Sequence, residues 1–97
     1  MININKTNFY ENWFNTLNLK EKAQIKSRLE RIENYEHFGD VRKLGDGLAE
    51  LRWKNGWRVY FCSVGHKEIL IVLGGHKNEQ EKNIRKAKLY IRRITTH

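Results

Sequence analysis

Residues 49–63, AELRWKNGWRVYFCS, place two stretches of alternating apolar and polar side chains on either side of a short Lys54-Asn55-Gly56 loop. Alternation with a period of two is typical of half-buried strands, so this stretch predicts a β-hairpin. A two-residue Asn55-Gly56 turn would set Trp53 opposite Arg58 and would mix apolar with charged side chains on both faces. A three-residue loop, with Gly56 in the left-handed conformation, instead sets Trp53 opposite Trp57. We therefore predict the three-residue loop.

The three-residue loop sorts the side chains of this hairpin onto an apolar face and a polar face. The apolar face carries Ala49, Leu51, Trp53, Trp57, Val59 and Phe61. The polar face carries Glu50, Arg52, Arg58 and Tyr60, and it sets the two arginines opposite each other. Paired arginines repel each other unless an anion or Glu50 lies between them, and a phosphodiester suits guanidinium groups. Two interpretations remain open: a phosphate-binding surface, or a solvated face on which Glu50 neutralises the arginines.

A buried strand is expected after the hairpin, where residues 68–73 (EILIVL) form an apolar run without alternation. Such a run is typical of a central strand covered on both faces. It ends in Gly74-Gly75-His76-Lys77, where two glycines would let the backbone approach a ligand closely. His76 and Lys77 are then expected at the rim of the polar face. His76 is a candidate acid or base because imidazole groups titrate near neutral pH, and the alternative is an ordinary loop histidine.

Two helices are predicted before the hairpin. The first is indicated by Phe9, Trp13, Phe14 and Leu17, which recur at helical spacing. Asn18 is the expected N-cap of the second helix, with Glu21 as its capping-box partner, and Gly39 is its expected C-terminal stop. The second helix is expected to turn Ile25, Leu29 and Ile32 inward and to expose Lys22, Lys26, Arg28 and Arg31 among Glu21, Glu30 and Glu33. This helical hairpin is interpreted as scaffold.

Residues 79–94 predict a third helix with one apolar and one basic face. The apolar stripe is Ile84, Ala87, Ile91 and Ile94, and the far side carries Lys82, Arg85, Lys86, Lys88, Arg92 and Arg93. The basic face could lie along an RNA backbone, or it could be an ordinary solvated surface. The candidate RNA contacts are Lys82, Arg85 and Lys86, together with Lys54 of the hairpin loop.

The formal net charge of +8 over 97 residues is unevenly distributed. Residues 1–49 contain eight basic and seven acidic side chains, whereas residues 50–97 contain eleven basic and four acidic ones. A basic excess of this size indicates a polyanionic partner: a nucleic acid, an anionic membrane or an acidic protein. The length fits a single domain that spans residues 1–97.

Composition disfavours several other classes of protein. The single cysteine, Cys62, cannot form an internal disulfide or a zinc cluster. No pair of histidines or carboxylates has metal-ligand spacing and no nucleotide-binding motif is present, so we expect neither a metal nor a small-molecule cofactor. The first residues lack a signal-peptide pattern, and no apolar run approaches the ~20 residues that span a bilayer. We therefore expect a cytoplasmic protein without a membrane segment.

These motifs, in this order, resemble the RelE/ParE superfamily of toxins. The resemblance rests on a helical hairpin followed by Leu48-Ala-Glu-Leu-Arg52, Gly56-Trp-Arg-Val-Tyr60, Leu73-Gly-Gly-His-Lys77 with Gln80, and then Ile84 and Ala87. The nearest branch is the HigB-like, phage-derived Gp49-like family, whose members are also called addiction module killer proteins. The resemblance implies an α+β, microbial-RNase-like fold with a helical hairpin, a mainly antiparallel sheet of four or five strands, and a C-terminal helix.

The resemblance also implies a function. Members of this branch are expected to be toxins of type II toxin–antitoxin systems that cut mRNA on the ribosome without a metal, and so inhibit translation and arrest growth. The expected partners are the ribosome, mRNA and a HigA-like helix-turn-helix antitoxin. The alternatives are a ParE-like inhibitor of DNA gyrase, or a non-catalytic module that binds an antitoxin or RNA.

Three basic residues match the family's phosphate-binding positions. The resemblance implies that Arg58 binds the scissile phosphate and that Lys77, after the last strand, has the same role. Arg52 lies where the family places basic residues on the preceding strand.

The acid and the base are less well matched. His76 stands where an aspartate is common in this branch, and Asn83-Ile84 stands where RelE has a tyrosine. The candidates that remain are His76 or Tyr60 as general acid, and Glu50 or His76 as general base.

Overall fold

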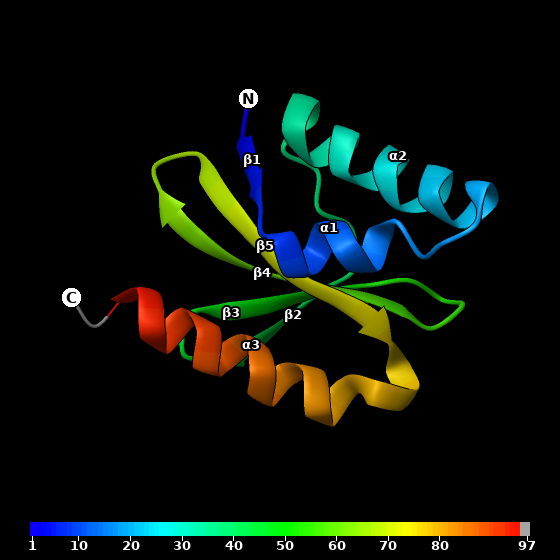
Figure 1. The fold of residues 1–97 in the computed structure, drawn as a ribbon. Helices are drawn as coiled ribbons and strands as arrows, with labels where there is room; N and C mark the ends of the chain where they lie inside the picture. The colour runs from blue at the N-terminus through cyan, green and yellow to red at the C-terminus, as the bar shows by residue number, and fades with distance from the viewer. Residues whose placement is uncertain (96–97) are drawn as a thin grey trace.

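The computed structural model describes residues 1–95 and contains a five-stranded sheet with helices on both faces (Figure 1). The elements, in chain order, are β1 (Asn3–Lys6), α1 (Asn8–Phe14), α2 (Leu19–Tyr35), β2 (Val41–Gly45), β3 (Leu48–Arg52), β4 (Trp57–Gly65), β5 (Glu68–His76), the 3-10 turn η1 (Lys77–Glu79) and α3 (Gln80–Thr95). The expected α+β fold class is confirmed. Residues 96 and 97 of the expected domain lie outside the described residues.

The sheet has the strand order β1-β5-β4-β3-β2, with β1 parallel to β5 and every other pair antiparallel. A mainly antiparallel sheet of four or five strands was expected from the resemblance, but the residues that form the two edge strands, β1 and β2, were not identified. Both are short and lie mostly in solvent, so neither shows the apolar alternation that marks a half-buried strand.

The β3–β4 hairpin has the predicted three-residue loop. Arg52 pairs with Arg58 across the strands, and the Trp53 amide donates to the Trp57 carbonyl at 3.0 Å. Gly56 has φ +102°, a conformation that favours glycine. The register predicted from side-chain sorting is therefore confirmed.

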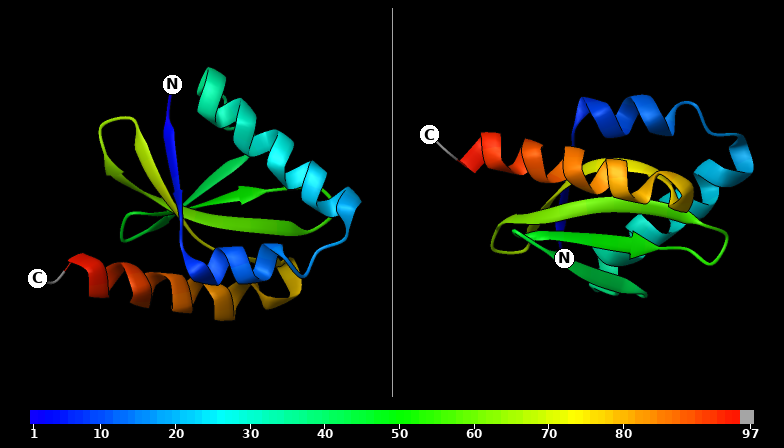
Figure 2. Two further views of the ribbon diagram at one scale, coloured as in Figure 1. Left: turned by 45° about the horizontal axis from the view of Figure 1, so that its top comes forward. Right: turned by 90° about the horizontal axis from the view of Figure 1, so that it is seen from below.

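Two helices cover one face of the sheet and the third covers the other, so the protein has three layers (Figures 1 and 2). Under α1 and α2 lies a core of Ile2, Tyr10, Leu17, Ile25, Leu29, Ile32, Leu51, Trp53, Val59, Phe61, Ile69 and Ile71. Under α3 lies a second core of Leu48, Tyr60, Cys62, Val72, Leu73, Ala87 and Ile91. β5 is buried between both layers, as its unbroken apolar run predicted.

The second helix begins where it was predicted to begin but ends earlier. The Asn18 side chain accepts from the Glu21 amide at 2.8 Å, and the Glu21 carboxylate accepts from the Asn18 amide, which completes the capping box. The C-cap is Glu36, with φ 55°, and not Gly39. The expected stop was wrong because Glu36 itself adopts the left-handed conformation that usually selects glycine.

Arg28 was expected on the outside of the second helix, and this expectation was wrong. Its side chain is buried, donates to the main-chain carbonyls of Phe38, Asp40 and Arg52, and lies 4.5 Å over the ring of Trp53. A buried guanidinium is tolerated because carbonyl oxygens and an aromatic face replace its water.

The two glycines of β5 have a packing role. A Cβ atom on Gly74 would overlap the ring of Trp13 on α1, and one on Gly75 would overlap the side-chain amide of Asn83 on α3. The interpretation that they admit a ligand was therefore wrong. They admit one side chain from each helical layer, and this lets both layers approach the end of the sheet.

Candidate active site

Four polar residues lie together on β3 and β4, on the face that α3 covers. Glu50 pairs with Tyr60 and Arg52 pairs with Arg58, so the four form a contiguous patch, which we call the polar cluster. The predicted sharing of one face is confirmed, but the cluster is not a solvated face. Glu50 and Tyr60 are 0% exposed and Arg58 is 7% exposed, while the side chain of Arg52 is 38% exposed.

Arg58 is anchored at the end of the hairpin. Its Nη1 donates to the carbonyls of Trp53 and Trp57 at 3.0 and 2.9 Å. Its Nε has no hydrogen-bond partner within residues 1–95. The guanidinium group is thus fixed in position by two carbonyl groups, and its Nε is buried without a hydrogen-bond partner among the described residues.

Glu50 is held from the start of α3. Its Oε2 accepts a hydrogen bond from Gln80 Nε2 at 2.8 Å. Its Oε1 lies 3.9 Å from Arg52 Nε, too far for a hydrogen bond, and neither atom has another partner among the described residues. The carboxylate therefore faces the arginines without closing on either of them.

Tyr60 stays protonated at neutral pH. Burial raises the pKa of its phenol well above the ordinary range, and the charge of Glu50 raises it further. The hydroxyl group has no hydrogen-bond partner in the described part of the chain. The phenol is thus a neutral donor beside the arginines.

His76 does not join the polar cluster. Its ring packs edge-on against Trp57 at 5.3 Å, and Trp57 contacts Trp13 of α1, so the imidazole lies on the opposite face of the sheet. It is half-exposed, and its Nδ1 accepts from the Asn78 amide at 3.4 Å. The expectation that it stands on the rim of the polar face was wrong, because β5 continues through His76 and its alternation turns this side chain toward α1.

Lys77 lies at the same end of the sheet as Arg58. Its side chain is exposed, and its amide donates to the Gly56 carbonyl at 2.7 Å, which ties η1 to the hairpin loop. The structure thus gathers three of the predicted phosphate-binding residues at one end of the sheet: Arg52, Arg58 and Lys77.

The predicted RNA contacts are exposed side chains near this end. Lys54 lies in the hairpin loop, and Lys82, Arg85 and Lys86 lie on the first half of α3, which begins at Gln80. Arg85 is 3.5 Å from Glu81, and the Lys86 ammonium lies over the ring of Phe9. These weak surface contacts leave the side chains accessible to a polyanion.

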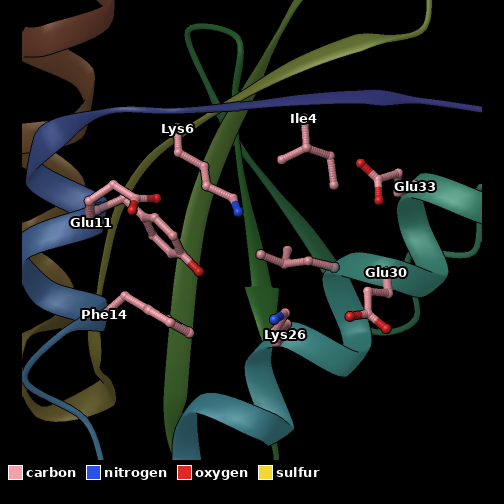
Figure 3. Close-up of a pocket in the computed structure, with 9 residues that line it drawn as sticks. Ile4, Lys6, Glu11, Phe14, Lys26, Glu30 and Glu33 are labelled. Carbon is pink, nitrogen blue, oxygen red and sulfur yellow. The ribbon is translucent and has the colours of Figure 1, made fainter.

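A groove of about 280 Å³ lies away from this site, between α1, α2 and β1 (Figure 3). Tyr10, Phe14 and Leu29 form its apolar part, and its charged lining residues are Lys6, Lys26, Glu11, Glu30 and Glu33. Three carboxylates against two ammonium groups do not favour a polyanion, so the candidate phosphate site is the polar cluster and not this groove.

Residues 1–95 contain no group of three or more histidine, cysteine, aspartate or glutamate side chains placed to hold a metal ion. Across the same residues, no helix has the length and apolar character that crossing a bilayer needs. Burial raises the pKa of the Cys62 thiol, which keeps this strand residue in its unreactive form.

Two side chains that shape the site are not predicted from the sequence. Gln80 lies in the motif after the last strand, which by itself indicates no role for its side chain. Arg28 was placed outside, although it shares the spacing of the inward residues Ile25, Leu29 and Ile32. That spacing indicates a buried position, whereas the positive charge of the side chain favours an exposed one.

Comparisons with known proteins agree with this architecture. Residues 12–95 match the model of the family described as "Phage derived protein Gp49-like (DUF891)". An uncharacterised protein of Haemophilus influenzae is 36% identical over 91 residues, which cover 91% of each chain.

Solved structures show the same fold. The isolated Escherichia coli RelE toxin superposes with a TM-score of 0.66 at 12% identity, over 87% of this chain and 99% of that one. The intact E. coli RelBE toxin–antitoxin complex matches with a TM-score of 0.63 at 11% identity, over 78% of this chain and 96% of that one. A conserved hypothetical protein of Helicobacter pylori matches with a TM-score of 0.54 at 14% identity, over 82% and 99%.

Proposed function

The chain belongs to the phage-derived Gp49-like family, and from this premise we propose that it is the toxin of a type II toxin–antitoxin pair. We propose further that it acts as a metal-independent, ribosome-dependent mRNA endonuclease. Membership of the family supports the assignment as a toxin, and the polar cluster supports the assignment as an endonuclease.

The observation on which the activity rests is the pairing of Arg52 with Arg58 at the end of the sheet that also holds Lys77. Two adjacent guanidinium groups repel each other, and a phosphodiester between them relieves this repulsion while accepting several charge-assisted hydrogen bonds. The same groups stabilise the extra negative charge of a pentacoordinate phosphorus. A well-placed donor of this kind contributes about 3–4 kcal/mol to the transition state.

The proposed reaction needs only proton transfer and charge stabilisation. A base removes the proton of a ribose 2′-OH, whose oxygen forms a bond to the adjacent phosphorus. The bond from phosphorus to the 5′-oxygen breaks, and that oxygen takes up a proton. The products are a 2′,3′-cyclic phosphate and a 5′-hydroxyl group, and no metal ion is required.

Burial distinguishes the candidates for proton transfer. Glu50 and Tyr60 are fully covered, whereas His76 is half-exposed where β5 leaves the sheet. A group that exchanges protons with RNA has to be reached by the RNA whose phosphate Arg52 and Arg58 bind, and His76 lies on the opposite face of the sheet from these arginines. Proton transfer is therefore assigned to none of the three residues. Glu50 and Tyr60 are the buried neighbours of the arginine pair.

The proposed partners follow from charge and from the comparisons. A toxin of this fold has been solved in complex with its antitoxin, which supports a protein antitoxin for this chain, here proposed to be HigA-like. The net charge of +8 suits a ribosomal and mRNA environment in the cytoplasm.

The test is primer extension on mRNA bound to purified, programmed ribosomes, with and without the protein. Codon-linked cuts that require the ribosome and leave a 2′,3′-cyclic phosphate support the proposal. Growth arrest without cuts, but with loss of DNA supercoiling, would identify a gyrase inhibitor instead. A protein that neither cuts mRNA nor arrests growth would be a non-catalytic binding module.

A further inference from the structure

We propose that Gln80 is a positioning residue that holds the Glu50 carboxylate away from Arg52 and Arg58, so that both guanidinium groups stay available to a phosphate. The biological meaning of this inference rests on the proposed function. The inference itself rests on the geometry of the polar cluster and can be tested without RNA.

Gln80 contacts the Glu50 carboxylate directly. Gln80 is the first residue of α3, and its side-chain amide reaches across to β3 to donate to Glu50 Oε2 at 2.8 Å. Glu50 is 0% exposed, so water does not compete for this hydrogen bond. A hydrogen bond from a neutral amide to a buried carboxylate is among the stronger ones in proteins.

This contact keeps the Glu50 carboxylate from turning toward the arginines. Glu50 Oε1 stops 3.9 Å from Arg52 Nε, and Arg58 Nε also lacks a partner within residues 1–95. The terminal torsion of a glutamate side chain is soft, so a carboxylate without a donor on its other oxygen would turn to form a close ion pair. With Gln80 in place, the carboxylate stays 3.9 Å from Arg52 Nε, and the buried Nε atoms of Arg52 and Arg58 have no hydrogen-bond partner within residues 1–95.

The type of residue at position 80 determines the charge that this contact adds to the polar cluster. The amide of Gln80 is neutral, so it can donate to Glu50 without adding a charge to the cluster. A carboxylate at position 80 would repel Glu50, and an apolar side chain would leave Oε2 without a donor. Lysine at this position would still donate to Glu50, with a positive charge.

The experiment measures binding of inorganic phosphate by NMR, through the Nε–Hε signals of Arg52 and Arg58. The variant is Gln80→Met, which keeps the length of the side chain but removes the donor. The matched control is Gln24→Met on α2, where an exposed glutamine loses only its 3.1 Å contact with Asn55. We expect phosphate affinity to fall about tenfold in Gln80→Met and to stay unchanged in Gln24→Met.

A second variant separates positioning from general damage to the fold. Gln80→Lys should retain at least the wild-type phosphate affinity, because its ammonium group still occupies Glu50. Equal affinity in wild type and Gln80→Met overturns the proposal. So does an equal loss in the Gln24→Met control, a loss of affinity in Gln80→Lys, or the absence of phosphate binding to the wild-type arginines.

The proposed function can fail separately from this inference. If phosphate binding follows the expected pattern while programmed ribosomes are not cut, the positioning role stands and the nuclease assignment fails. If ribosomes are cut but Gln80→Met binds phosphate and cleaves mRNA like wild type, the nuclease assignment stands and the positioning role fails.

Discussion

The guanidinium group of Arg28, on α2, donates a hydrogen bond to the main-chain carbonyl of Arg52 at the end of β3. The side chain of Arg52 leaves the same residue on the opposite face of the sheet and joins the polar cluster. The layer of helices that was interpreted as scaffold therefore fixes the backbone from which a candidate phosphate-binding residue projects.

Replacing Arg28 with alanine should lower the free energy of unfolding by about 2–4 kcal/mol, because the carbonyl groups of Phe38 and Asp40 lose buried donors. Urea denaturation measures this change. Arg31→Ala, on the exposed side of the same helix, should change stability by less than about 0.5 kcal/mol. Similar values for the two variants would contradict a bridging role for Arg28.

Replacing Arg58 with alanine should reduce cleavage of ribosome-bound mRNA by about 10²–10³-fold and abolish growth arrest, because a fixed phosphate-binding donor is lost. Binding of the antitoxin should persist. The variant also loses hydrogen bonds to the Trp53 and Trp57 carbonyls, so a melting curve has to show that it is folded at the assay temperature. A folded Arg58→Ala that remains fully toxic would refute the assignment.

Replacing Gly75 with alanine should destabilise the protein by about 1–3 kcal/mol, because the new methyl group overlaps the side chain of Asn83. Adding Asn83→Ala should restore part of the loss, since it removes the overlapping amide. Thermal unfolding of Gly75→Ala, Asn83→Ala and the double variant gives the coupling energy between the two positions. Purely additive losses would mean that the glycine serves something other than helix packing.

The hairpin, the buried strand and the capping box could be predicted because each depends on residues close together in sequence. Side-chain sorting alone selected the three-residue loop between Trp53 and Trp57. β1 could not be found in this way, because it pairs with β5, far along the chain, and its own residues are mostly exposed. β2 pairs with the neighbouring β3, but its residues are also mostly exposed and show no apolar alternation.

The polar cluster also combines a feature that local sequence predicts with one that depends on distant parts of the chain. Alternation correctly placed Glu50, Arg52, Arg58 and Tyr60 on one face, but it could not show that α3 would cover that face. Burial of Glu50 depends on where α3 begins, which is set by the turn at residues 77–79 and by the packing of α3 against Gly75. His76 was misplaced because the length of β5 was underestimated by three residues.

Replacing Tyr60 with phenylalanine should have little effect on stability at neutral pH, because the hydroxyl group has no partner within the described residues. The raised pKa of Tyr60 means that stability is complete below about pH 10, the ordinary pKa of tyrosine, and falls as the pH rises above it. The free energy of unfolding of Tyr60→Phe should therefore fall less steeply between pH 10 and pH 12 than that of the wild type. Chemical denaturation at a series of pH values measures this difference.

Tyr10 limits how much of the alkaline loss of stability the Tyr60→Phe substitution removes. Burial also raises the pKa of Tyr10, so part of the alkaline loss should remain in Tyr60→Phe. Because Tyr60 is assigned no proton transfer, the variant should also cleave mRNA at close to the wild-type rate. A loss comparable to that of Arg58→Ala would instead make Tyr60 the general acid.

Neutralising Lys82, Arg85 and Lys86 together to glutamine should weaken binding of a single-stranded RNA oligonucleotide and flatten its dependence on salt. Each phosphate contact on a single strand contributes roughly 0.7 to the slope of log affinity against log salt, so three contacts should lower it by about 2. The control neutralises Lys20, Lys22 and Lys26 on α2, in the opposite layer, and removes the same charge. Equal slopes in the two triple variants would mean that net charge alone attracts RNA. A selective loss on α3 would mean that this helix lies along the backbone of the strand whose phosphate the polar cluster binds.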